Sequence, residues 1–338
     1  MPRIRCPAVP LCAYADPLIR ELKRLVPRAL EEWDEKSIHE ARVATRRLRA
    51  AAGLVEPLAD AELLAPLLKA LKRLRRRLGP LRDLDVMLGH LRPLLGRPRH
   101  AEAARWLSDR IRSARNAARR KVRKNEDPAR WRQKLDAWEP VRQRIVQLGD
   151  EVEATMLASL PRQWDAFAAH AGRLATHLLD APEQDIHDPH ELRIAGKLLR
   201  YTLEMAAAAG HRPPALVTRS FKRMQGELGL WHDHVVLAER AMRESLDAQL
   251  AHHDPDLQAR VLDLVRASLL ASQRHLKRFA RLWRDRGPAM GEAVGQLGGG
   301  GGGGGGGGVS EPRTDRDRFG SATPQAAEGA PPVEPSAA

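Results

Sequence analysis

The feature that most constrains this chain is an eleven-residue string that occurs twice, about 150 positions apart. It is HEARVATRRLR at 39–49 and HELRIAGKLLR at 190–200. On a helix with about 100° per residue, the histidine and the cations at steps 3, 7 and 10 share an arc of about 80°. The two rows are His39, Arg42, Arg46 and Arg49, and His190, Arg193, Lys197 and Arg200. Each row is about 15 Å long, which suits a polyanion better than a single small anion.

The composition favours packed helices over sheets. Of the 338 residues, 43% are hydrophobic and only 4% are aromatic, and Ala and Leu are abundant whereas β-branched runs are scarce. Hydrophobic periodicity between Pro and Gly breaks therefore predicts an all-α fold. The expected helices lie at residues 16–34, 38–57, 61–78, 81–95, 100–125, 130–159, 162–180, 189–209, 213–228, 231–251 and 256–286.

The chain is also organised as a duplication. Segments 72–83 and 222–233 repeat Lys-Arg, Leu-Gly and a final Asp at an offset of 150, one less than the offset of the rows. We predict a first helical bundle at 1–158 and a second, pseudo-symmetric one at 159–288. Eleven consecutive glycines and a region rich in Pro and Ala follow, so we predict a disordered tail at 289–338.

Both charged helices have recognisable start signals. Ser37 lies three residues before Glu40, which is the spacing of a capping box. Asp188 lies three residues before Glu191, and Pro189 occupies the favoured first helical position. These signals predict that the histidine of each row lies in the first helical turn, where free backbone amides and the helix dipole attract anions.

The charge indicates an anionic partner. A net charge of +14 and a pI near 10.6 would steer nucleic acid, inorganic polyphosphate or an anionic membrane surface towards the protein. Arginine supplies 47 of the 57 basic residues, and a guanidinium binds phosphate oxygens bidentately, which favours a phosphate partner.

Other sequence features predict a cytoplasmic protein without a membrane contact. No stretch approaches the roughly 18 apolar residues of a membrane span, and the basic N-terminus lacks the apolar core of a signal peptide. Cys6 and Cys12 lie in an N-terminus that we expect to be frayed, without a second pair to complete a zinc site.

The twin rows, with the Leu-Gly-x-x-x-Asp segments that follow them, resemble the CHAD domain, the conserved histidine α-helical domain, over roughly residues 15–285. The resemblance implies two helical bundles around a basic central groove that binds inorganic polyphosphate, and association with polyphosphate granules. It implicates all eight residues of the rows and Tyr201, which matches an Arg-Tyr ending. It adds a second group on the following helices, Lys72, Arg73, Arg76, Lys222 and Arg223.

The chain differs from one arrangement of that family, in which a triphosphate-tunnel domain precedes the helices. Only some 15 residues precede the first expected helix, and the chain has no Glu-x-Glu-x-Lys motif. We therefore expect no triphosphatase activity by that route. The hypothesis is non-enzymatic polyphosphate binding, with no catalytic residue and no cofactor.

Two other functions could use the same charged faces. A nucleic-acid-binding protein would bind a similar row of phosphates, but Phe and Tyr total only six residues, which leaves few stacking aromatics. A metal-dependent polyphosphate hydrolase would hold divalent ions near residues 83 and 233. The strings Asp83-Leu-Asp85 and His232-Asp-His234 lack the i, i+4 pairing of zinc motifs, so we predict no metal ligands. Asp83 and Asp233 would instead orient arginines or cap the next helix.

Overall fold

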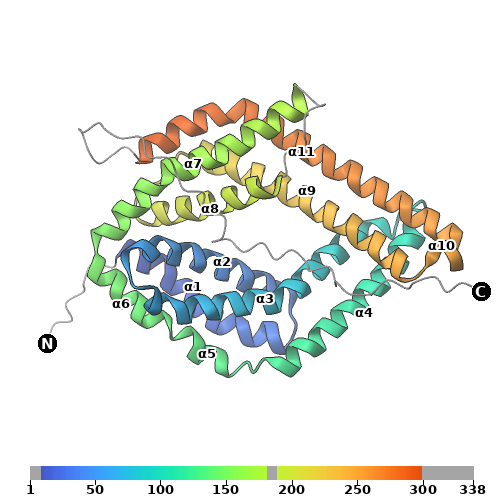
Figure 1. Ribbon diagram of the computed structural model, residues 1–338, viewed down its shortest axis with the longest axis horizontal. Helices are drawn as coiled ribbons and strands as arrows, with labels where there is room; N and C mark the ends of the chain where they lie inside the picture. The colour runs from blue at the N-terminus through green and yellow to red at the C-terminus, as the bar shows by residue number, and fades with distance from the viewer. Residues whose placement is uncertain (1–8, 181–188, 299–338) are drawn as a thin grey trace, which may run out of the picture. The chain divides into compact units, whose positions relative to one another are not determined.

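The computed structural model describes residues 9–180 and 189–298, and every regular element in these ranges is helical (Figure 1). The predicted all-α fold is confirmed. These residues belong to one compact unit. The helices are α1 (Pro10–Glu31), α2 (Glu35–Val55), α3 (Ala61–Leu91), α4 (Ala101–Asn125), α5 (Arg130–Leu135), α6 (Trp138–Leu148), α7 (Asp150–Leu179), α8 (Pro189–Ala208), α9 (Ala215–Asp247), α10 (Leu250–His253) and α11 (Pro255–Gly298), with short 3-10 turns at Glu56–Leu58 and Arg92–Leu94.

Two long helices continue through positions at which Gly and Pro predicted a break. α3 passes through Gly79 and Pro80, and α9 passes through Gly229. An internal proline removes one backbone hydrogen bond, but the neighbouring Leu78 and Leu81 are completely buried. Packing of the apolar face therefore outweighs the local preference, as it does for most helices in proteins.

The expected helix at 130–159 is wrong. The chain forms α5, α6 and the start of α7 there, and it turns between α6 and α7 at Gly149, whose φ of 55° suits glycine. α7 then continues through Pro161, so it crosses the position at which we placed the boundary between the two repeats. The division into repeats at 158/159 stays a prediction.

Both ends of the described chain are more ordered than expected. Cys12 is a buried residue of α1, because it packs with the apolar face of that helix instead of fraying. Residues 289–298 belong to α11, where Met290 and Val294 are completely buried, so the predicted disorder is wrong for this part of the tail. The remainder of the predicted tail, 299–338, and also Cys6 and Asp188, lie outside the described residues.

The start of α2 differs from the predicted capping box. The N-cap is Asp34, whose carboxylate accepts hydrogen bonds from the backbone N of Ser37 at 2.9 Å and from its hydroxyl at 2.6 Å. An aspartate is a stronger acceptor than the serine at this position, and the helix begins at Glu35, three residues earlier than predicted. His39 therefore lies beyond the first turn of α2, whereas His190 is the second residue of α8.

Two hydrophobic clusters hold the first and second halves of the chain together. The larger one joins α1, α2 and the start of α3 to α7, α8 and the end of α11. The smaller one joins the end of α3 and the start of α4 to the end of α9 and the start of α11. Because each cluster draws residues from both halves, the contact between α2 and α8 in the middle of Figure 1 is held from two sides.

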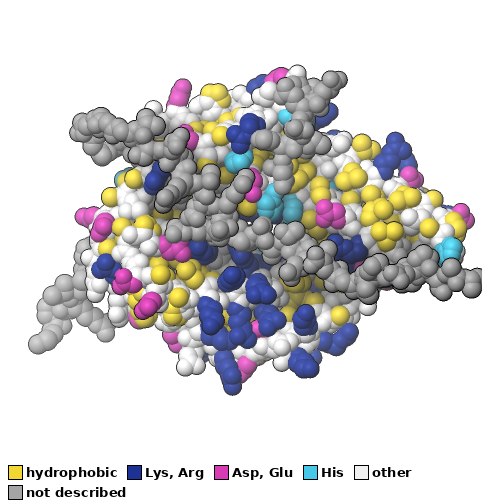
Figure 2. Space-filling model, viewed as in Figure 1, with side chains coloured by type: hydrophobic (Ala, Val, Ile, Leu, Met, Phe, Trp, Pro, Cys, Tyr) yellow, Lys and Arg dark blue, Asp and Glu magenta, His cyan; other side chains and the backbone are white. Residues whose placement is uncertain are grey.

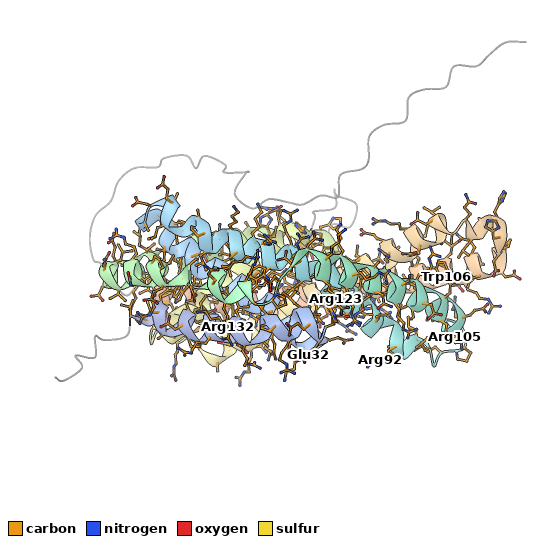
Figure 3. The ribbon with its side chains drawn as sticks, turned by 90° about the horizontal axis from the view of Figure 1, so that it is seen from below. Glu32, Arg92, Arg105, Trp106, Arg123 and Arg132 are labelled. Carbon is orange, nitrogen blue, oxygen red and sulfur yellow. The ribbon has the colours of Figure 1, made fainter. Side chains whose placement is uncertain are left out.

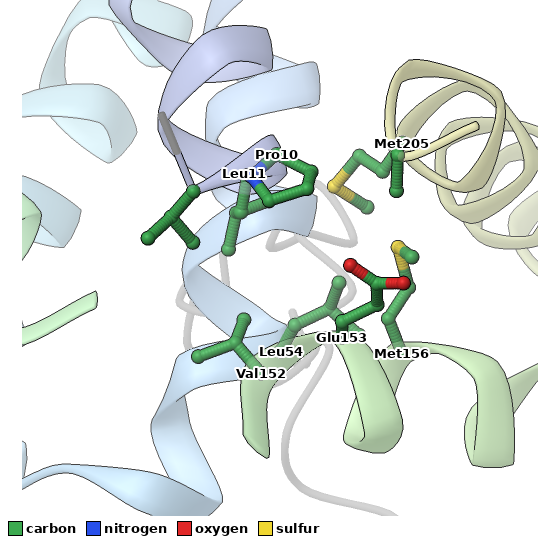
Figure 4. Close-up of a pocket in the computed structure, with 9 residues that line it drawn as sticks. Pro10, Leu11, Leu54, Val152, Glu153, Met156 and Met205 are labelled. Carbon is green, nitrogen blue, oxygen red and sulfur yellow. The ribbon is translucent and has the colours of Figure 1, made fainter. Parts of the chain in front are cut away.

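The packing between the halves is close. Figure 4 shows the small cavity that remains between α1, α2, α7 and α8, where the side chains of Met156 and Met205 point towards one another beside Glu153. Its volume is about 10 Å³, which is no larger than the space for one water molecule. It therefore offers no room for a ligand.

Truncation of the aromatic centre of the larger cluster should destabilise the whole unit. Phe167 is 0% exposed and packs edge-on against Phe221 and Trp283, with ring centroids 5.1 and 5.6 Å away. Phe167→Ala should lower the free energy of unfolding by about 3–5 kcal/mol, measured by urea denaturation followed by circular dichroism. The control is Leu246→Ala, at a side chain that is 68% exposed, which should change stability by less than about 0.5 kcal/mol. Similar losses in both variants would contradict this account of the core.

Candidate polyanion-binding site

The two charged rows lie on α2 and α8 and face one another. Burial lowers the pKa of Arg193 and of Lys197, and the positive charge of Arg46 on the opposite helix lowers both further. Such an effect requires the side chains to approach across the contact between the two helices. We call the following residues the central basic cluster: His39, Arg42 and Arg46 of α2, and His190, Arg193 and Lys197 of α8.

Arg42 is fixed against the backbone of α3. Its side chain is 18% exposed, its Nη1 donates to the carbonyl oxygen of Arg75 at 3.2 Å, and its Nη2 lies 3.6 Å from Oδ1 of Asp83. The guanidinium passes close to Gly79, where a Cβ would lie only 2.9 Å from Nη1. Burial lowers the pKa of Arg42, and Asp83 opposes that effect. Gly79 of segment 72–83 therefore leaves space for the guanidinium of Arg42, whereas no atom of the described residues approaches its counterpart Gly229 in this way.

The cations nearest the contact between the rows have no ion-pair partner in the described parts of the chain. Arg46, Arg193 and Lys197 make no such pair, and the buried Nε of Arg46 has no hydrogen-bond acceptor within these ranges. Burial lowers the pKa of Lys197 from 10.5 to about 7, and Arg193, Arg46 and Arg42 contribute to the same shift by repulsion. The free protein thus holds positive charge at a cost that a bound anion would remove.

Asp83 of α3 and Asp233 of α9 are two acidic residues beside the cluster. Desolvation raises the pKa of Asp83, Arg42 opposes that rise, and Asp233 adds to it, so the two carboxylates lie in each other's field. Asp233 also lies 3.5 Å from Nε2 of His90. Both aspartates sit inside long helices, so the alternative that they cap the next helix is wrong, and the position of Asp83 beside Arg42 agrees with an orienting role.

The last cation of each row pairs with a carboxylate of its own helix or of the turn that follows. Arg49 lies 3.0 Å from Glu56, and Arg200 lies 2.9 Å from Glu204. Glu204 also accepts a hydrogen bond from Arg47 at 2.8 Å, and the buried Tyr201 packs in the larger hydrophobic cluster. The geometry places Arg49, Arg200 and Tyr201 at the margin of the site, and a binding role for them stays a prediction.

The second group of predicted residues divides by helical position. Residues that are 7 or 11 positions apart lie within about 20° of one another around a helix axis. Lys72 and Arg76 therefore share the face of α3 that carries Asp83. Lys222 likewise shares the face of α9 that carries Asp233. Arg73 and Arg223 lie one residue further along, about 80° away from those faces.

Arg73 is engaged elsewhere in the fold. Its Nε donates to the carboxylate of Glu126 at 2.9 Å, and Arg77 donates to the same group at 2.6 Å. The Glu126 side chain is only 1% exposed, so the pair of arginines compensates a buried charge at the end of α4. This contact is structural, and a binding role for Arg73 is the weakest of the predicted assignments.

Two residues near the cluster were not among the predicted site residues. Burial lowers the pKa of His39, and the charge of Arg82 lowers it further, which places Arg82 beside the row on α2. Burial also lowers the pKa of His232 to about 4, and Arg193 adds to that effect. The sequence contains a signal for both residues, because Arg82 and His232 occupy equivalent positions in the repeated segments 72–83 and 222–233. Figure 2 shows Lys and Arg side chains gathered over α3 and His side chains over α9 on this face.

The positions of the His, Cys, Asp and Glu side chains show where a metal ion could bind. Within residues 9–180 and 189–298, no three His, Cys, Asp or Glu side chains are grouped so that they could hold a metal ion. His234 lies between His90 and His275, with ring centroids at 4.9 and 5.6 Å, and burial lowers its pKa to about 4.

Within residues 9–180 and 189–298, no helix is long and apolar enough to cross a lipid bilayer.

Comparison with known proteins assigns the fold. The chain belongs to the CHAD domain family, whose family model matches residues 13–242. The structure is similar to the crystal structure of the CHAD domain from the plant Ricinus communis, with a TM-score of 0.54 and 21% sequence identity. That likeness covers 86% of this chain and 90% of the plant chain, and it shows a shared fold. Comparison with curated proteins returns no significant match.

The lowered pKa of Lys197 should make stability depend on pH. Between pH 7 and 10.5 the unfolded chain keeps a proton on Lys197 that the folded protein has lost, so the contribution of this group to stability rises with pH across that window. The slope should reach at most about 1.4 kcal/mol per pH unit. Lys197→Met should remove this component in urea denaturation at several pH values, whereas Lys69→Met, at an exposed lysine of α3, should leave it. An unchanged slope in Lys197→Met would contradict the assignment.

Proposed function

We propose that this protein binds inorganic polyphosphate through the central basic cluster, without converting it chemically, and that this binding directs it to polyphosphate granules. The observation that carries the proposal is the approach of Arg46 to Arg193 and Lys197 across the contact of α2 and α8, with no carboxylate paired to any of the three in the described chain. The association of CHAD domains with polyphosphate supports the choice of ligand.

The geometry favours a linear ligand over a single anion. From His39 to Arg46 the row on α2 extends about 10 Å along the helix, and the row on α8 repeats this extent from His190 to Lys197. Two facing rows can contact one chain of phosphates from both sides. A single phosphate would neutralise only one or two of these cations and would leave the others in mutual repulsion.

Each part of the cluster has a distinct task in this proposal. Arg46 and Arg193 supply guanidiniums that donate bidentate hydrogen bonds to phosphate oxygens. Arg42 is held rigidly by α3, so little side-chain entropy is lost when it meets a ligand. Above pH 7, Lys197 gains a proton beside an anion, because burial and its cationic neighbours lower its pKa to about 7 in the free protein.

Charge reversal in the two rows should abolish binding without unfolding the protein. Arg46→Glu combined with Arg193→Glu should weaken the affinity for long-chain polyphosphate by about a hundredfold or more, because two charge-assisted contacts become repulsive. The measurement is isothermal titration calorimetry, with circular dichroism as the test of folding. These positions are better targets than Arg42, whose removal would also disturb α3. For the unaltered protein, affinity should fall steeply as salt rises, because bound counterions are released.

The controls separate the proposal from its alternatives. Arg286→Glu reverses an exposed arginine of α11 and should leave the affinity unchanged. Displacement of labelled DNA by polyphosphate at a much higher phosphate concentration than the reverse would support a nucleic-acid-binding protein. Release of phosphate with Mg²⁺ or Mn²⁺ would support a hydrolase. A fluorescent fusion should form foci that disappear in cells without polyphosphate, and persistence of those foci would contradict granule targeting.

Polyphosphate affinity should also depend on pH through Lys197. The ligand favours the protonated amine, whose pKa in the free protein is about 7, so binding above that pH must include uptake of a proton. The dissociation constant should therefore increase from pH 7 to 9, by up to about tenfold per pH unit. Lys197→Met should bind more weakly at pH 7 and should show a flatter profile over this range. An equally steep profile in that variant would assign the titration to another group.

A further inference from the structure

A second, smaller concentration of arginine lies away from the central basic cluster, between the start of α2, the end of α3 and α4. Here the surface forms a cavity of about 360 Å³ that is open to solvent. Its lining includes Arg92, Arg112 and Arg115 and one acidic residue, Glu35. Figure 3 shows this side of the molecule, with Arg92 near the end of α4 that carries Arg105 and Trp106. The size falls within the range of cavities that hold small organic ligands.

The cavity lies on the opposite side of α3 from the central basic cluster. Asp85, Leu88 and Arg92 fall within about 60° of one another around that helix, whereas Asp83, beside Arg42, points about 160° away from Asp85. On the cavity side α3 packs against α4, because the Arg115 guanidinium contacts the buried carboxylate of Asp85. A ligand in the cavity would therefore not share its contacts with a ligand between α2 and α8.

The residues that line the cavity include three arginines and one carboxylate. Arg112 pairs with the exposed Asp109 at 2.7 Å, and Arg115 contacts the buried Asp85 and lies 3.5 Å from Glu35, but Arg92 makes no ion pair with any residue that the structure describes. One turn beyond Arg115, burial lowers the pKa of Arg119, and the charge of Arg115 lowers it further. Such a group of guanidiniums provides the planar, multidentate donors that a phosphate monoester accepts.

An independent observation is the hydroxyl of Ser108. This residue of α4 is only 2% exposed and lines the cavity, and its side chain makes no hydrogen bond to any residue in the described ranges. The hydroxyl adjoins the open cavity, where a ligand oxygen can accept a hydrogen bond from it. The serine therefore indicates an occupant that accepts a hydrogen bond next to Arg112.

The remaining lining argues against a bare phosphate chain. Leu88 and Leu95 form an apolar part of the wall, and Glu35 would repel a ligand that is anionic along its whole length. The carboxylate of Glu35 and the amide of Asn116 suit hydroxyl or amino groups on an organic body. We propose that this cavity binds a small organic phosphate of mononucleotide size, with its phosphate on the arginines and Ser108 and its organic part against the two leucines.

The test uses the full chain with AMP and ribose 5-phosphate as probes. Each should raise the melting temperature in a thermal-shift assay, and calorimetry should find one site that remains when polyphosphate is saturating. Arg112→Glu should weaken AMP binding by about tenfold or more, because a charge-assisted contact is lost. Ser108→Ala is the milder variant, which keeps the fold of α4 and should weaken binding without abolishing it.

Matched variants distinguish this inference from the proposed function. The double variant of Arg46 and Arg193 should keep AMP binding, and Arg112→Glu should keep polyphosphate binding. Loss of AMP binding in the double variant, or displacement of AMP by polyphosphate, would overturn a separate site. Equal stabilisation by inorganic phosphate would overturn the organic part of the ligand, and no stabilisation by either probe would overturn the site itself. None of these results depends on whether the central basic cluster binds polyphosphate.

Discussion

The repulsion between like charges on α2 and α8 is the constraint that the rest of the structure has to accommodate. Arg46, Arg193 and Lys197 meet where water is partly excluded, and the low pKa of Lys197 records the cost of that arrangement. Two hydrophobic clusters that each draw on both halves of the chain keep the helices in place against this repulsion. The packing of the two clusters thus stabilises a fold in which like charges on α2 and α8 repel one another, as is common at functional sites.

The acidic residues are distributed so that the centre keeps its excess of positive charge. Glu126 pairs with Arg73 and Arg77 at the end of α4, and Glu204 pairs with Arg47 and Arg200. These pairs hold helices together away from the contact between the rows. Near the centre lie Asp83 and Asp233, which sit beside arginines instead of forming close pairs with all of them. The pattern separates structural arginines from those available to a ligand, even where both kinds lie on one helix, as Arg46 and Arg47 do on α2.

The comparison between prediction and structure shows where local signals suffice. The rows on 39–49 and 190–200 have a strict helical spacing, so their helices and their membership of the CHAD family could be predicted. Errors occurred where tertiary packing outweighs local preference. Pro80 does not end α3 because buried leucines flank it, and residues 289–298 extend α11 because Met290 and Val294 reach the core. The spacing of Ser37 to Glu40 predicts Ser37 as the N-cap, whereas Asp34 is the residue that caps the helix because its carboxylate is the stronger acceptor.

The sequence by itself determined which residues carry charge and on which face of a helix they lie, because helical geometry places residues at fixed angles from their spacing alone. Only the tertiary structure decided that the two faces meet, since that depends on contacts between segments far apart in the chain. It also decided that Arg49 and Arg200 are paired with carboxylates, whereas Arg46 and Arg193 pair with none in the described part of the chain. The pKa of Lys197 belongs to the same class of property, because it depends on burial and on neighbours that are distant in sequence.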